Sequence, residues 1–149
     1  MKIKTHSERE TRKIAKALGE TIKNSKRKKP LVIGLVGDLG SGKTTFIKGF
    51  ARGLGVRRRL TSPTFLIMRS YKLKATSYEL LFHVDAYRIK KSKELVTLGF
   101  KEIISDPKNI VVIEWADNVK RLLPKNRLSI KFRHGKEENE RTMEFKPNA

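Results

Sequence analysis

Eight consecutive residues, Gly37–Thr44, have the types and spacing needed to bind the phosphates of a nucleotide. They fit the Walker A pattern of a glycine, four free positions and then Gly-Lys-Thr. The glycines allow backbone conformations in which successive N–H groups point at one anion. Lys43 would bring its ammonium group to the β and γ phosphates, and the Thr44 hydroxyl would be one ligand of magnesium. This run and the residue after it therefore predict a site for ATP and Mg²⁺ made by Gly37, Gly40, Ser41, Gly42, Lys43, Thr44 and Thr45.

The segments on either side of this run are a predicted strand and a predicted helix. Leu31–Val36 is short, apolar and rich in branched residues, as in a strand that is covered on both faces. From Thr44 to Leu54 the apolar residues fall on one helical stripe, and Gly55 stands where a C-terminal cap belongs. The positive N-terminal end of this helix would point at the same anion. This context argues against the alternative, a glycine turn that contains a lysine by chance.

Two acidic residues stand at the ends of later apolar runs. Asp85 ends a predicted strand from Glu79, and Glu114 ends another from Ile110. Because the carboxyl ends of parallel strands meet at one edge of a sheet, both carboxylates would reach the phosphates. ATP hydrolysis needs an acid to hold magnesium or to orient the attacking water. We therefore predict Asp85, Glu114 and Lys43 as catalytic and Thr44 and Glu114 as metal ligands; which acid orients the water stays open, and a cap or a surface ion pair is the alternative for each.

His83 and Trp115 lie beside these acids in the sequence. A buried neutral imidazole is more often satisfied by the backbone than catalytic, so His83 receives no role. Trp115 has two equal interpretations: an aromatic of the core or cleft, or a flat side chain that shields the site or meets a partner.

The remaining elements complete one α/β domain over residues 1–149. A capping box formed by Ser7 and Glu10 opens the first helix, and a polar stretch near the end separates the strands of a hairpin. The expected architecture is a three-layer P-loop NTPase sandwich with a mixed, centrally parallel sheet and a C-terminal hairpin. The other predicted elements are a strand at Phe65–Leu73, a helix at Ser92–Leu98, helical turns at Asp117–Leu123 and hairpin strands at Arg127–Arg133 and Thr142–Lys146.

Composition adds a strong positive charge and no cysteine. The chain has 35 Lys and Arg against 15 Asp and Glu, a formal net charge of +20. Such a charge attracts polyanions, and the densest runs are Lys26–Lys29, Arg57–Arg59 and Lys90–Lys93. No aromatic stacking motif accompanies them, which favours a solvated lysine-rich surface. The lack of cysteine and of an apolar run of about 20 residues predicts a cytoplasmic protein without a membrane span.

Four blocks in order resemble the TsaE family, small bacterial ATPases required for the threonylcarbamoyl modification of adenosine next to the tRNA anticodon. The blocks are Gly37–Thr45, Thr61–Phe65, His83–Arg88 and Ile113–Trp115. The resemblance spans most of the chain. It implies an ATPase that acts on an assembly of TsaD and TsaB. Because no arginine finger lies in a committed position, we expect slow hydrolysis in isolation and faster turnover with these partners. Contact with tRNA is expected to be indirect; the alternative is that Arg57–Arg59, just before Thr61, meet its phosphates directly.

The resemblance also implies roles for individual residues. Thr44 and Glu114 would serve magnesium, Asp85 would assist hydrolysis, and Thr11 would lie near the nucleotide. A nucleotide-sensitive switch loop would contain Ser62, Pro63, Thr64 and Phe65.

Two other functions fit parts of the sequence. Short P-loop proteins often phosphorylate nucleosides or metabolites, but such kinases need a lid with arginines, for which this chain leaves little length. A basic RNA-binding module that holds nucleotide only as a structural ligand would explain the charge. Transfer of phosphate to a nucleoside would support the first, and RNA binding indifferent to ATP would support the second.

Overall fold

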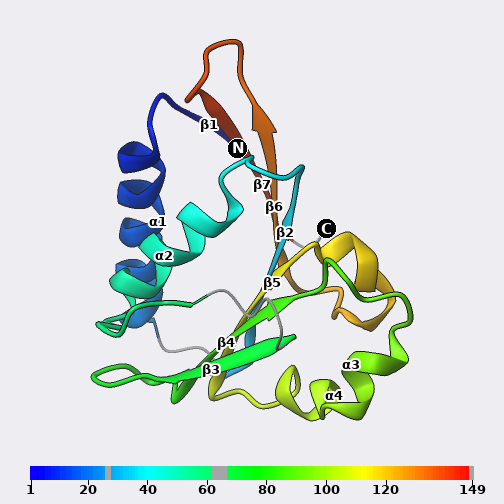
Figure 1. Cartoon of the computed structure of the whole chain (residues 1–149). Coiled ribbons are helices and arrows are strands. Elements are labelled where there is room, and N and C mark those ends of the chain that lie inside the picture. Colours follow the sequence, from blue (N-terminus) through cyan, green and yellow to red (C-terminus); the bar gives the residue numbers. More distant parts are fainter. Residues whose placement is uncertain (26–27, 62–66, 148–149) are drawn as a thin grey trace.

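The computed structural model describes residues 1–25, 28–61 and 67–147, and its ribbon is drawn in Figure 1. Strands and helices alternate through the middle of the chain, and two strands end it. The elements are β1 (Lys2–Thr5), α1 (Glu8–Lys23), β2 (Leu31–Val36), α2 (Lys43–Gly53), β3 (Met68–Lys72), β4 (Leu80–Asp85), α3 (Lys93–Thr97), α4 (Phe100–Ile103), β5 (Asn109–Glu114), the 3₁₀ helix η1 (Ala116–Leu122), β6 (Leu128–His134) and β7 (Arg141–Pro147).

The strands form one seven-stranded sheet in the order β1-β7-β6-β2-β5-β4-β3. The four central strands, β6, β2, β5 and β4, run parallel to one another. The outer strands β3, β7 and β1 pair antiparallel with their neighbours. The sheet therefore confirms the expected α/β fold with a mixed, centrally parallel sheet, and β6 with β7 confirms the C-terminal hairpin.

Helices cover both faces of the sheet. Figure 1 shows α1 and α2 together on one side and α3 and α4 on the other. Successive strand side chains point to opposite faces, so Ile33 packs with Phe50 under α2, whereas Val32 packs with Phe100 under α4. All five residues from Leu31 to Leu35 are consequently buried. This two-sided burial is the physical reason why β2 is apolar throughout.

Several predicted boundaries agree with the structure. The strand Leu31–Val36 has the expected bounds, and the predicted helix from Thr44 to Leu54 corresponds to α2. Ser7 caps α1, because its hydroxyl oxygen accepts a hydrogen bond from the backbone N–H of Glu10 at 3.1 Å.

Other elements depart from the sequence-based expectation. The strand β1 was not foreseen, since four residues that alternate with lysine carry little signal and its partner β7 is remote in the sequence. The predicted helix Ser92–Leu98 is shorter, and its start is stabilised by the carboxylate of Glu94, which accepts from the backbone of Lys90 and Lys91, instead of by Ser92. The helix α4 was also missed, and the turns predicted at Asp117–Leu123 are the 3₁₀ helix η1.

The helices α1 and α2 approach each other closely through glycines. A side-chain carbon at Gly53 would overlap the carbonyl oxygen of Lys16 and lie 2.9 Å from the backbone nitrogen of Glu20. Gly19 and Gly49 have similar overlaps with the facing backbone. This contact sets the position of α2 relative to α1, and therefore holds the glycine loop that precedes α2.

We expect Gly53→Ala to lower the free energy of unfolding by about 1–3 kcal/mol, because the two backbones would have to separate. Urea denaturation measures this. The control is Lys48→Ala, at an exposed position of the same helix, which should change stability by no more than about 0.5 kcal/mol. Equal effects of the two substitutions would contradict the close helix contact.

Candidate functional site

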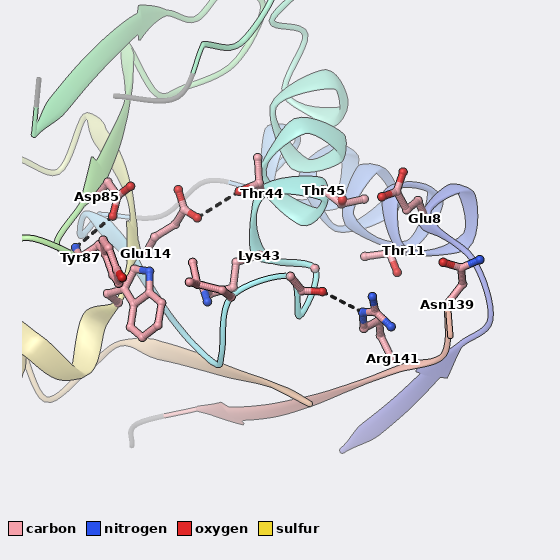
Figure 2. Close-up of a pocket in the computed structure, with 14 residues that line it drawn as sticks. Glu8, Thr11, Lys43, Thr44, Thr45, Asp85, Tyr87, Glu114, Asn139 and Arg141 are labelled. Atoms are coloured by element: carbon pink, nitrogen blue, oxygen red, sulfur yellow. Dashed lines mark hydrogen bonds between the residues drawn. The ribbon is translucent and has the colours of Figure 1, made fainter. Parts of the chain in front are cut away.

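A cavity of about 300 Å³ opens at the carboxyl ends of β2, β4 and β5. Figure 2 shows Asp85 and Glu114 at one end of it and Thr11 and Arg141 at the other, with Lys43 between them. The position agrees with the general rule that open α/β sheets bind ligands outside the carboxyl ends of their strands.

The glycine loop between β2 and α2 forms the floor of this cavity. Gly42 is the N-cap of α2 with a φ of 107°, a conformation that residues with a side chain rarely adopt, and no side chain caps the helix. The free backbone N–H groups of the first turn therefore remain available to an anion. Ser41 is 1% exposed, and its hydroxyl oxygen has no hydrogen-bond partner among the described residues. An anion bound by the loop would satisfy both features.

Lys43 lies at the centre of the cavity. Its ammonium donates to the backbone oxygens of Gly37 and Asp38, the latter at 2.9 Å. It also lies 4.2 Å from the centre of the Trp115 ring, within the range of a cation–π interaction. Burial lowers the pKa of Lys43, and the carboxylates of Glu114 and Asp38 oppose this shift. The ammonium is thus positioned by weak carbonyl acceptors that a phosphate could replace.

Glu114 is held from both sides. Its Oε1 accepts the hydroxyl of Thr44 at 3.2 Å, and its Oε2 lies 2.7 Å from Nε2 of His83. Glu114 and His83 are 5% and 1% exposed. A buried carboxylate needs such partners, because each unpaired oxygen would otherwise lose its hydration. The two contacts keep the carboxylate directed toward the first turn of α2.

Asp85 stands beside Glu114 in the register of β4 and β5. Its Oδ1 accepts the backbone N–H of Tyr87 at 3.0 Å. Burial raises the pKa of Asp85; the hydrogen bond from Tyr87 lowers it, and the negative charge of Glu114 raises it again. The carboxylate is therefore a better proton acceptor than an exposed aspartate.

This raised pKa predicts that Asp85→Asn stabilises the protein near neutral pH. The folded state raises the pKa of this carboxyl because it disfavours the ionised form. The contribution of Asp85 to the free energy of unfolding is therefore fully present below the unfolded pKa of about 3.9, and it is lost as pH rises through the folded pKa. We expect a melting temperature roughly 1–4 °C above wild type at pH 7 and no difference below about pH 3.5. Calorimetry at both pH values measures this, with Asp117→Asn at an exposed position as the control. A lower melting temperature at pH 7 would contradict the effect of burial.

The remaining predicted site residues are distributed as follows. Thr11 lines the cavity from α1, and its hydroxyl oxygen lies 2.8 Å from that of Thr5. Gly37 and Ser41 are absent from the cavity wall, and Gly37 contributes only its carbonyl oxygen to Lys43. Gly40, Gly42, Thr44 and Thr45 line the cavity. The predicted switch loop Ser62–Phe65 lies outside the described residues.

The C-terminal hairpin supplies wall residues that sequence reasoning missed. Nε of Arg141 donates to the carbonyl oxygen of Gly40 at 3.2 Å, which ties the glycine loop to β7, and Asn139 lies beside it. On the opposite side Tyr87 is half exposed, with its ring centre 4.9 Å from that of Trp115. Both rings line the cavity, so Trp115 is an aromatic of the cleft. The one sequence feature that indicated a position in the cleft is that Trp115 directly follows Glu114.

The described residues contain no group of three or more His, Asp and Glu side chains that could hold a metal ion without other ligands. None of the helices in this part of the chain is both long enough and apolar enough to cross a membrane.

Comparison with known proteins gives consistent results. The family described as "Threonylcarbamoyl adenosine biosynthesis protein TsaE" matches residues 5–143. The tRNA threonylcarbamoyladenosine biosynthesis protein TsaE of Bacillus subtilis is 38% identical over 95% of this chain and 84% of its own length. The protein of the same name from Rickettsia felis is 36% identical, over 79% of this chain and 64% of the relative.

A solved structure agrees with these sequence matches. The crystal structure of Bacillus subtilis YdiB superimposes with a TM-score of 0.73 at 32% identity, covering 100% of this chain and 86% of the other. The family match covers nearly the whole described chain, including the glycine loop and both acids. The chain therefore belongs to the TsaE family of threonylcarbamoyl adenosine biosynthesis proteins.

Proposed function

We propose that this protein is the ATP-binding and slowly hydrolysing subunit of the system that makes threonylcarbamoyladenosine next to the anticodon of tRNA. One observation carries the proposal: a glycine loop, an uncapped helix N-terminus, Lys43 and the Thr44–Glu114 pair surround a single cavity. Family membership provides the pathway. In this proposal the fold is a three-layer P-loop NTPase sandwich, and the protein acts in the cytoplasm.

The arrangement of the cavity suggests how ATP would lie in it. The phosphates would occupy the glycine loop, where Lys43 would exchange the carbonyl oxygens of Gly37 and Asp38 for phosphate oxygens of higher charge. The terminal phosphate would face Asp85 and Glu114. The nucleoside would then lie toward Thr11 and Arg141, the residues that Figure 2 shows at the other end of the cavity.

Thr44 and Glu114 fit a magnesium ion. Mg²⁺ prefers oxygen ligands and usually takes only one or two protein groups, with phosphates and water completing its shell. A hydroxyl and a carboxylate oxygen 3.2 Å apart at the end of the loop supply this set. His83 would keep Glu114 in place when Thr44 turns from the carboxylate to the metal. The bound ion would neutralise charge on the phosphates.

Asp85 is the proposed base or orienting group for the attacking water. A carboxylate with a raised pKa accepts a proton more readily, and the side chain stands beside Glu114 at the same strand ends. Trp115 and Tyr87 would limit access of bulk water on that side. Substitution of each acid in turn tests which of the two holds magnesium and which orients the attacking water.

We expect slow hydrolysis of ATP by the protein without partners. The one arginine on the described cavity wall, Arg141, already donates to the carbonyl oxygens of Gly40, Glu138 and Glu140, and Arg88 is exposed outside that wall. Arg141 also lies at the end of the cavity opposite the two acids, so no arginine of the described wall stands where the transferred phosphoryl group would be. An assembly of TsaD and TsaB would complete the site, and the loop Ser62–Phe65 would respond to the nucleotide.

Two measurements test this proposal. Calorimetric titration of a non-hydrolysable ATP analogue with Mg²⁺ should show binding at one site per chain. The rate of ATP hydrolysis should then rise at least about 10-fold when TsaD and TsaB are added. No heat of binding would overturn the ATP site, equal rates would overturn completion by partners, and phosphate transfer to a nucleoside would support a kinase instead.

A further inference from the structure

A second and larger hollow, of about 1060 Å³, lies over α1, α2 and residues 55–60, and it shares no lining residue with the nucleotide cavity. We call it the basic groove. Among the residues that the structure describes, ten cationic side chains line it, and Glu20 is the single carboxylate. The cationic residues are Arg9, Arg12, Lys13, Lys16, Lys23, Lys48, Arg52, Arg57, Arg58 and Arg59.

The charge of this groove is almost uncompensated. Arg12 and Lys16 each reach a carboxylate of their own helix only at the limit of an ion pair, 3.9 and 4.0 Å. The other eight cations have no carboxylate within 4.0 Å among the described residues. Elsewhere lysines pair more closely, for example Lys4 with Glu140 at 3.0 Å. Concentrated like charge of this kind repels itself and favours a bound polyanion.

The cations also form an extended and ordered array. Along α1 they recur at nearly every turn from Arg9 to Lys23, a row about 21 Å long at the rise of an α-helix. The arginine run is tied down beside it, because Arg52 donates to the carbonyl oxygen of Arg57 at 3.2 Å. Arg58 lies 5.5 Å from the ring centre of Tyr71. Residues about 40 positions apart in the sequence thus line one groove.

We infer that the basic groove binds the sugar–phosphate backbone of folded RNA. A long row of cations suits a polymer of regularly spaced charges better than a small anion. None of the described residues that line the groove is aromatic, so it would contact backbone instead of stacking on single-stranded bases. The apolar side chains of the described lining are Ala51, Val56 and Leu60, which offer little for insertion into a membrane.

This inference replaces the expectation of a solvated surface and of indirect contact with tRNA. The choice of RNA among polyanions rests on the proposed role in tRNA modification, while the charge of the groove is independent of ATP binding. The direct contact would place the protein on the backbone of the RNA, with the nucleotide cavity at a separate position on the same two helices.

The test compares variants that each remove three charges from the full-length protein. One carries Arg57→Gln, Arg58→Gln and Arg59→Gln. A second carries Arg9→Gln, Lys13→Gln and Lys16→Gln. The matched control carries Lys90→Gln, Lys91→Gln and Lys93→Gln, which alters a basic run outside the groove. The binding of an unmodified tRNA transcript is measured by fluorescence anisotropy from low to moderate salt.

Each groove variant should bind tRNA at least about 10-fold more weakly near 0.1 M salt, with the slope of log affinity against log salt reduced by about 2. The control should stay within about 3-fold of wild type. Equal losses in all three variants would show an effect of net charge alone and overturn the inference. Equal competition by polyglutamate or by anionic vesicles would overturn it in favour of an acidic protein or a lipid surface.

The ATP analogue separates this inference from the proposed function. All three variants should bind it as wild type does, and Lys43→Ala should still bind tRNA. If wild type bound no nucleotide but lost tRNA affinity only in the groove variants, the ATP proposal would fail and the groove would stand. If nucleotide bound and the groove variants matched the control, the reverse would hold.

Discussion

Replacing Lys43 by alanine should weaken the binding of ATP by about 100-fold, which corresponds to the loss of one or two charge-assisted hydrogen bonds. The ammonium is the only cation between the two ends of the described cavity, and it is held there by the carbonyl oxygens of Gly37 and Asp38. The fold should survive, because these acceptors can turn to water and burial of the charge already opposes its ionised form.

Calorimetric titration of the ATP analogue measures this loss. Lys48→Ala is the control, since Lys48 lies on the same helix but outside the cavity, and it should leave the affinity within about 2-fold of wild type. Equal affinities in the two variants would mean that Lys43 does not meet the phosphates. A melting curve on each protein shows that a loss of binding is not a loss of fold.

The parts of this site that follow local rules could be predicted from the sequence. A glycine loop between an apolar strand and an amphipathic helix is specified within about 25 residues, and each step of that pattern has a backbone cause. The acids Asp85 and Glu114 were placed by a second local rule, that apolar strands end at one edge of a parallel sheet. The structure brings both beside the first turn of α2.

What escaped prediction depends on which strands become neighbours. Arg141 reaches the glycine loop only because β7 pairs with β6, which pairs with β2. The contact of His83 with Glu114 requires β4 beside β5 in one register. The basic groove needs the glycine contact that brings α1 against α2. No sequence pattern at a fixed spacing indicates any of these pairings.

Glu114 and Lys43 have different contacts, and this difference predicts different effects of the two residues on nucleotide binding and on hydrolysis. Glu114 is 5% exposed, and burying its carboxylate has a desolvation cost that an apolar residue at this position would not have. Its two hydrogen bonds join it to the Thr44 hydroxyl and the His83 ring. Lys43 is held instead by the carbonyl oxygens of Gly37 and Asp38. Glu114 is thus suited to act on a metal or a water, and Lys43 to act on phosphate charge. Separate substitutions should separate these effects.

Glu114→Gln should leave the affinity for the ATP analogue within about 3-fold of wild type and lower single-turnover hydrolysis by about 100-fold to 1000-fold. Glutamine has nearly the same shape and can keep a hydrogen bond to Thr44 or His83, but it removes the negative charge that would hold magnesium. Half-maximal activity should therefore require more Mg²⁺.

Rapid-quench hydrolysis at saturating ATP over a range of Mg²⁺ concentrations measures both effects. Glu102→Gln, at an exposed position on α4 away from the cavity, should match wild type in each. If Glu114→Gln lost as much nucleotide affinity as Lys43→Ala and hydrolysed what it bound at the normal rate, the carboxylate would be part of the binding surface. The catalytic role would then fall to Asp85, whose raised pKa makes it the remaining proton acceptor at this edge of the sheet.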